Sequence, residues 1–243
     1  MGPAVSWARS SGDAVTVTTV HLVRHGEVHN PTGVLYGRMD GYHLSDLGRR
    51  MAQRVADALV DREIVAVIAS PLERAQETAG PVAEAHGLEI GTDARVMESG
   101  NVFQGKRFGV GDGVLKKPQA WRHLWNPWRP SWGEPYKEVV ARMMAGVYAA
   151  RDAARGREAV VVSHQLPIWI TRLHIEKRSF VHDPRRRQCT LCSLTSLTFV
   201  DDEITTVRYS EPAADLIPVR DRQAPFSAGG AADQDKPPPV AGA

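Results

Sequence analysis

The stretch "VTVTTVHLVRHGEVHN" (15–30) decides how the rest of the chain is interpreted. Residues 15–23 are apolar or β-branched almost without interruption, which is typical of a buried central strand in a parallel sheet. The strand runs directly into Arg24 and His25 rather than into turn-forming residues. Because burying these side chains costs free energy unless something pairs with them, they indicate a bound phosphoryl group at the end of this strand.

The composition of the whole chain excludes several classes of protein. Its 243 residues are enough for one substantial core. The formal net charge is only +2, with no charged block, which gives no support for nucleic acid as a partner. The apolar runs are shorter than the roughly 20 residues of a membrane helix, and residues 1–15 lack the apolar core of a secretory signal. We therefore expect a cytoplasmic protein that binds neither nucleic acid nor membrane.

Strands and helices alternate along the chain. This alternation predicts an α/β fold, a three-layer α/β/α arrangement with a mostly parallel central sheet. An antiparallel pair of strands, 189–200 and 203–210, is expected to close the sheet. The other predicted strands cover 64–70 and 158–164, and the predicted helices cover 44–61, 71–87 (kinked or restarted at Pro81), 134–156 and 166–175.

The ends of the chain differ from its middle in composition. Residues 1–14 are expected to form a flexible N-terminus, and residues 15–211 the folded domain. From 212 to 243 the chain is rich in Pro, Gly and Ala, which predicts a disordered tail.

Three of the predicted strands lead into cationic side chains. The first ends in Arg24 and His25, the second leads to Arg74, and the third ends in His164. Each residue alone could be a surface arginine or a buried core histidine. Because ligands bind at the carboxyl ends of parallel strands, their joint placement favours one shared site. A phosphate monoester, largely a dianion near neutral pH, would offset these charges and accept paired hydrogen bonds from arginine.

These motifs resemble those of the histidine phosphatase superfamily, which includes phosphoglycerate mutases and many phosphatases. The resemblance rests on "LVRHGE" (22–27), "ASPLERAQETA" (69–79) and "VVVSH" (160–164), in the order typical of the family. It extends through "YGRMDGYHLSDLGRRMA" (36–52) and covers roughly residues 17–210. The resemblance implies a phosphoglycerate mutase-like fold.

The resemblance also implies a division of roles. His25 would attack phosphorus and form a phosphohistidine that water then hydrolyses, with its other ring nitrogen bound to a fixed acceptor. Arg24, Arg74 and His164 would bind the non-bridging oxygens, an arrangement that needs no metal ion or other cofactor. Glu98, in "ARVMESGNVFQGK" (94–106), would protonate the leaving oxygen, the alternative being a solvated loop glutamate.

Three further polar residues are weaker candidates. Asn30 lies five residues after His25, where the family usually has asparagine six residues after it, and is a candidate phosphate contact. Gln165 follows His164 where the family commonly has glycine, and would add a polar group to the site. Glu27 is expected to orient the main chain and an arginine rather than to act as the acid.

An insertion over about 106–133 separates the predicted acid from the helix at 134–156. It has four tryptophans at helical spacing, which either pack on the domain or form an aromatic lid over the phosphate site. Basic residues would make this lid attractive to anions. The tryptophans are Trp121, Trp125, Trp128 and Trp132, and the basic residues are Lys116, Lys117, Arg122, His123 and Arg129. The triplet 185–187 is either solvated or at the entrance to the site.

The function favoured by these residues is a phosphomonoesterase that acts on a small phosphorylated metabolite. Phosphoglycerate mutase is the alternative, but that branch has tyrosine after its acid, whereas Ser99 and Gly100 follow Glu98 here. A non-catalytic phosphate-binding protein is a third hypothesis. A zinc or redox role of Cys189 and Cys192 ranks last, because residues three apart in a strand face opposite sides. Monomer and homodimer are both left open.

Overall fold

The computed structural model describes residues 15–31, 33–101, 104–105, 133–182 and 187–217. Six strands form one sheet in the order β3-β2-β4-β1-β5-β6. The first four of these are mutually parallel, and β5 and β6 are antiparallel, which confirms the predicted fold class. The elements are β1 (Val17–Arg24), α1 (Asp46–Leu59), β2 (Ile64–Ala69), α2 (Glu73–His86), β3 (Ile90–Thr92), the short helix η1 (Ala94–Val96), α4 (Tyr136–Ala153), β4 (Glu158–Ser163), α5 (Gln165–Ile175), β5 (Leu194–Val200), β6 (Glu203–Ser210) and the short helix η4 (Ala214–Leu216).

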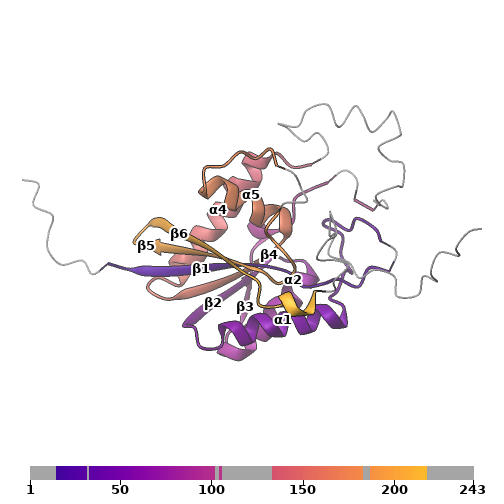
Figure 1. Ribbon diagram of the computed structural model, residues 1–243, viewed down its shortest axis with the longest axis horizontal. Coiled ribbons are helices and arrows are strands. Elements are labelled where there is room, and N and C mark those ends of the chain that lie inside the picture. The colour runs from indigo at the N-terminus through magenta and orange to yellow at the C-terminus, as the bar shows by residue number, and fades with distance from the viewer. Residues whose placement is uncertain (1–14, 32, 102–103, 106–132, 183–186, 218–243) are drawn as a thin grey trace, which may run out of the picture.

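Helices cover both faces of the sheet. Figure 1 shows α1 and α2 on one face and α4 and α5 on the other. Side chains along β4 alternate between the two faces of the sheet. Val160 and Val162 pack in the core with α1 and α2. Ala159 and Val161 pack in the core with α4 and α5. Because a central strand is buried on both faces, its sequence is a continuous run of apolar residues.

Helix α1 follows from its sequence pattern. Met51, Val55 and Leu59 lie four residues apart, and all three are buried on the sheet side. The hydroxyl of Ser45 accepts a hydrogen bond from the N–H of Gly48 at 2.9 Å and caps the first turn. Such a cap contributes about 1 kcal/mol.

Two expectations about the elements need correction. α2 is one helix that continues across Pro81, so of the two alternatives, a kink or a restart, the restart is wrong. β5 begins at Leu194 rather than at 189, because a turn occupies the preceding residues and Cys192 has a left-handed φ of 54°. Cys189 and Cys192 still diverge, since they are buried in the cores on opposite faces of the sheet.

The C-terminal boundary of the fold lies later than expected. Ala213 is buried, and η4 follows it. The predicted tail from 212 therefore begins with residues that still belong to the fold. The expectations for 1–14, for the tryptophan-rich insertion 106–132 and for 218–243 lie outside the described residues.

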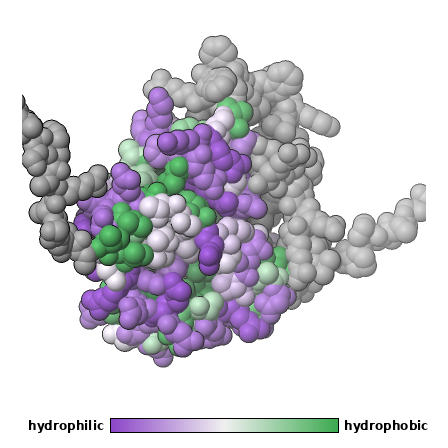
Figure 2. Space-filling view, turned by 60° about the vertical axis from the view of Figure 1, so that its left-hand side comes forward, coloured by the Kyte–Doolittle hydropathy of each residue, from purple (hydrophilic) through white to green (hydrophobic). Residues whose placement is uncertain are grey.

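The surface is mixed in polarity. In Figure 2 polar residues predominate on the visible face, and hydrophobic ones gather in small groups. Among the described residues, no helix has the length and apolar character required to cross a membrane. Within the described ranges, the large hydrophobic residues with exposed side chains are Val15, Val17, Val60, Tyr148 and Val181.

Two glycines bring α1 against the end of β1. A Cβ on Gly26 would lie 2.7 Å from the carbonyl oxygen of Gly48, and a Cβ on Gly48 would lie 2.0 Å from the carbonyl oxygen of Glu27. The hydroxyl of Ser45 also donates to Glu27 Oε1 at 2.7 Å. The residues after His25 are thus fixed on the first turn of α1 by main-chain contact.

We predict that Gly48→Ala lowers the free energy of unfolding by about 2 kcal/mol or more, because neither main chain can give way. Gly80→Ala is the matched control within α2, since nothing lies within 4 Å of its Cβ position. This control should be neutral or more stable by about 0.5–1 kcal/mol, as Ala is favoured over Gly in helices. Urea unfolding of both variants checks the prediction, and equal stabilities would contradict it.

Candidate active site

The imidazole of His25 is held in one tautomer at the carboxyl end of β1. Its Nδ1 lies 2.8 Å from the carbonyl oxygen of Gly26. A carbonyl can only accept, so Nδ1 carries the hydrogen and Nε2 keeps a lone pair. Burial lowers the pKa of His25 well below its ordinary value, and the charges of Arg74 and Arg24 lower it further. Nε2 is therefore available as a nucleophile near neutral pH.

His164 lies beside His25 because of the strand register. Arg24 pairs with Ser163 across β1 and β4, so the residues that follow the two strands are neighbours. The ring centroids of His25 and His164 are 5.2 Å apart. Nε2 of His164 lies 2.8 Å from the hydroxyl oxygen of Ser70, and its buried Nδ1 has no hydrogen-bond partner within the described ranges. Burial, followed by the charge of Arg74, lowers the pKa of His164 well below its usual value.

Arg74 enters the site from the first turn of α2. Its side chain is fully buried, with Nη2 donating to the carbonyl oxygen of Gly37 at 2.6 Å. Nε and Nη1 are also buried and have no hydrogen-bond partner in the described part of the chain. The guanidinium lies 4.7 Å from the ring centroid of Tyr36. Burial lowers the pKa of Arg74, so an anion at this position would be strongly favoured.

Arg24 and Gln165 share one acceptor. Nη1 of Arg24 donates to the carbonyl oxygen of Cys189 at 2.7 Å, and Nε2 of Gln165 lies 3.4 Å from the same oxygen. The segment before β5 therefore holds the guanidinium of Arg24 in place through the carbonyl of Cys189. Gln165, the first residue of α5, lies next to Arg24 at this carbonyl.

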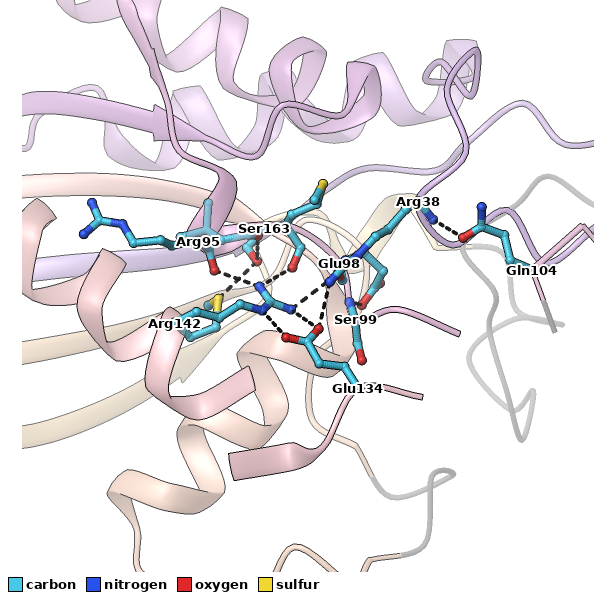
Figure 3. A network of polar contacts seen from close by, with 11 residues as sticks. Arg38, Arg95, Glu98, Ser99, Gln104, Glu134, Arg142 and Ser163 are labelled. Atoms are coloured by element: carbon cyan, nitrogen blue, oxygen red, sulfur yellow. Dashed lines mark hydrogen bonds and ion pairs between the residues drawn. The ribbon is translucent and has the colours of Figure 1, made fainter. Parts of the chain in front are cut away.

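Glu98 follows η1 in a segment without regular secondary structure. The hydroxyl of Ser163 donates to the carbonyl oxygen of Val96 at 2.6 Å, which ties this segment to the end of β4 (Figure 3). Burial raises the pKa of the Glu98 carboxyl, opposed by the N–H of Ser99 and by the charge of Arg74. A carboxyl group with a raised pKa is suited to donate a proton.

The remaining predicted residues act on the main chain around the site. Asn30 donates to the carbonyl oxygen of Val34 at 2.8 Å and accepts from its N–H at 3.2 Å. It thus fixes the loop that leads to Tyr36. Glu27 binds the hydroxyl and the N–H of Ser45 and so holds the start of α1.

Sequence reasoning missed several residues that surround the site. Tyr36 is buried with its ring centroid 6.4 Å from that of His25, and burial raises its pKa to about 12. Ser70 contacts His164, a role that its position before Pro71 and Leu72 in the quoted motif could have indicated. Arg187 was not missed, since the triplet 185–187 was expected either in solvent or at the entrance to the site; its Nε donates to Nε2 of His182 at 2.9 Å, and burial lowers its pKa.

The fold and the site together define a phosphoglycerate mutase-like α/β protein with two histidines and two arginines at the carboxyl edge of its sheet. Residues 20–212 match the model of the histidine phosphatase superfamily (branch 1), and the chain belongs to this family. No cluster of three or more His, Cys, Asp or Glu side chains suited to a metal ion occurs among the residues with described positions.

The chain is similar to an uncharacterized protein and to proteins named as a mutase and as a phosphatase. It is 56% identical over 197 residues to the uncharacterized protein Rv0525 of Mycobacterium tuberculosis, covering 81% of this chain and 98% of that one. It is 29% identical over 189 residues to a probable phosphoglycerate mutase, GpmB, of Yersinia pestis, covering 74% and 84%. A solved structure of mycobacterial glucosyl-3-phosphoglycerate phosphatase Rv2419c superposes with a TM-score of 0.58 at 26% identity, covering 79% and 96%.

The depressed pKa values of the two histidines predict a loss of stability in acid. Below about pH 6.5 the unfolded chain binds protons at His25 and His164 that the folded chain does not, so the free energy of unfolding falls as pH falls. Each proton that the unfolded chain binds and the folded chain does not lowers the free energy of unfolding by about 1.4 kcal/mol for each pH unit of acidification. Urea unfolding between about pH 7 and pH 5 should show a smaller slope for His25→Gln/His164→Gln than for the wild type. Equal slopes would contradict the prediction.

Proposed function

We propose that this protein is a phosphomonoesterase that hydrolyses a small phosphorylated metabolite through a phosphohistidine intermediate. The observation that carries this proposal is a group of buried nitrogens that have no hydrogen-bond partner among the described residues, beside the unprotonated Nε2 of His25. They are the donors Nε and Nη1 of Arg74 and Nδ1 of His164, which is a donor in the tautomer whose Nε2 accepts from the hydroxyl of Ser70. Buried donors without partners are rare and call for a ligand. A tetrahedral dianion supplies acceptors in several directions at once, as these donors require.

The chemistry follows from these groups. Nε2 of His25 attacks phosphorus in line with the ester bond, a nitrogen–phosphorus bond forms, and the bond to the ester oxygen breaks. Glu98 gives its proton to the departing oxygen, and the alcohol leaves. Water then attacks the phosphohistidine, with the Glu98 carboxylate accepting a proton, and inorganic phosphate is released. Arg24, Arg74 and His164 hold the non-bridging oxygens during both steps.

Phosphoglycerate mutase activity is the second candidate, because the GpmB relative is named as a probable phosphoglycerate mutase and the first chemical step would be shared. In a mutase the phosphohistidine would return its phosphoryl group to the substrate rather than to water. The residues after Glu98 are Ser99 and Gly100 rather than the tyrosine of the mutase branch, which favours hydrolysis. An activity that depends on added 2,3-bisphosphoglycerate would favour phosphoglycerate mutase over a phosphatase.

We predict that the wild type hydrolyses p-nitrophenyl phosphate and that His25→Ala abolishes this turnover. Brief reaction and quenching in alkali should leave a phosphorylated protein in the wild type and none in the variant. His29→Ala is the matched control, since His29 is exposed only four residues away and should retain full activity. Turnover that survives in His25→Ala would refute the assigned nucleophile. Absence of turnover on a broad panel of monoesters would favour a phosphate-binding protein.

The proposed role of Glu98 predicts a dependence on the leaving group. An alkoxide must be protonated as it departs, whereas p-nitrophenolate is stable enough to leave unaided. Glu98→Gln should therefore reduce kcat for an alkyl phosphate such as glycerol phosphate by about 10²–10⁴-fold and reduce it far less for p-nitrophenyl phosphate. Equal losses for the two esters would argue against proton donation by Glu98.

A further inference from the structure

The main chain of Glu98 is held by two guanidinium groups from distant parts of the sequence. Nε of Arg38 donates to the carbonyl oxygen of Glu98 at 2.6 Å, and Nη2 of Arg142 lies 3.4 Å from the same oxygen. Figure 3 shows both side chains converging on this residue, Arg142 from α4 and Arg38 from the loop before α1. Because η1 ends at Val96, no regular secondary structure fixes the chain at this point.

Arg142 binds the whole segment that leads to Glu98. Its Nη1 donates to the carbonyl oxygens of Arg95 at 2.7 Å and Met97 at 2.6 Å. With its contact to the Glu98 carbonyl, one side chain thus satisfies three main-chain acceptors over four residues. Arginine can do this because its five N–H donors lie in a rigid plane.

Glu134 connects the two arginines. Its Oε1 accepts from Nε of Arg142 at 2.7 Å, and its Oε2 accepts from Nη2 of Arg142 at 3.0 Å and from Nη2 of Arg38 at 2.8 Å. The N–H of Glu134 also donates to the carbonyl oxygen of Gly100 at 3.1 Å, two residues after Glu98. The carboxylate of Glu134 therefore fixes both guanidinium groups, and its main chain fixes the far side of the acid segment.

We propose that Arg142, Glu134 and Arg38 form a positioning network that aims the Glu98 carboxyl at the leaving oxygen of the substrate. The inference rests on the proposed function. Largely buried ion pairs contribute little to stability compared with apolar packing, but they fix geometry through directional hydrogen bonds. Arg142 and Glu134 are each only 17% exposed. Nε and Nη2 of Arg142 bind the Glu134 carboxylate, and this orientation points Nη1 at the carbonyl oxygens of the segment before Glu98. The three residues are positioning residues, since none donates the proton itself.

The test compares two esters in Arg142→Lys and Glu134→Gln. Lysine keeps the charge of Arg142 but cannot bind a carboxylate and three carbonyls together. Both variants should lose about 10- to 100-fold in kcat for glycerol phosphate, as expected for a catalytic group displaced by about 1 Å. The loss for p-nitrophenyl phosphate and the change in the inhibition constant of inorganic phosphate should stay within about threefold, because the groups that hold phosphate are not altered.

The matched controls are Arg172→Lys and Glu176→Gln. This ion pair, between Arg172 of α5 and Glu176 directly after it, has a similar distance of 2.7 Å and similar exposures of 12% and 23%, but it does not contact the Glu98 segment. Neither control should change the ratio of the two kcat values. If Arg142→Lys does not fold, Arg38→Lys replaces it in the test, and the same larger loss of kcat for glycerol phosphate than for p-nitrophenyl phosphate is expected.

The outcomes separate this inference from the proposed function. Equal losses for both esters in Arg142→Lys and Glu134→Gln, or lower thermal stability with an unchanged ratio of kcat values, would overturn the positioning network and leave the phosphatase proposal standing. A wild type that hydrolyses neither ester would overturn the proposed function itself. A shifted ratio in the control variants would show that the ratio reports general destabilisation and would also overturn the inference.

Discussion

The burial of the Arg74 guanidinium is the constraint on which the candidate site depends. A charge without a counterion in the interior costs several kcal/mol, even after the protein relaxes around it. The acceptor of its Nη2 is a neutral carbonyl, that of Gly37, and burial drives the nearby carboxyl of Glu98 toward its neutral form rather than toward a stable ion pair. Among the described residues Arg74 forms no direct ion pair, and the carboxyl groups of Glu98 and Glu73 favour its charged form only in part against the effect of burial. Such an arrangement is consistent with a doubly charged ligand, whose binding would offset the cost.

The same environment determines the reactivity of the histidines. Low dielectric and neighbouring guanidinium groups both disfavour an imidazolium ion, so the lowered pKa values of His25 and His164 follow from the burial that also creates the anion site. The carbonyl of Gly26 selects the tautomer that leaves Nε2 of His25 with its lone pair. The proposed nucleophile would therefore need no separate base to activate it, and affinity for phosphate and readiness to attack it would have one physical origin.

Much of this arrangement could be predicted from the sequence because it is set by local patterns. The apolar run before Arg24 predicts a central strand, and parallel topology then brings the residues after three strands to one edge. β3 was missed because three residues give no periodic signal, and the turn at Cys192 was missed because its Thr- and Leu-rich surroundings imitate a strand. The network of Glu134 and Arg142 leaves no local pattern at all, since Arg142 binds carbonyls 45 and 47 residues away in the sequence.

Two kinds of placement are thus combined in one site. The groups expected to hold phosphate are fixed by main-chain register at the ends of β1 and β4 and by the first turn of α2, which a single side-chain substitution hardly moves. The proposed acid is held by side-chain donors on an irregular segment, which a single substitution can shift. In the proposed mechanism the leaving group departs on the side of Glu98, so changes in that segment would alter which alcohols are released without disturbing the phosphate contacts. This separation gives a physical reason why one fold can serve proteins named as phosphatases and as mutases.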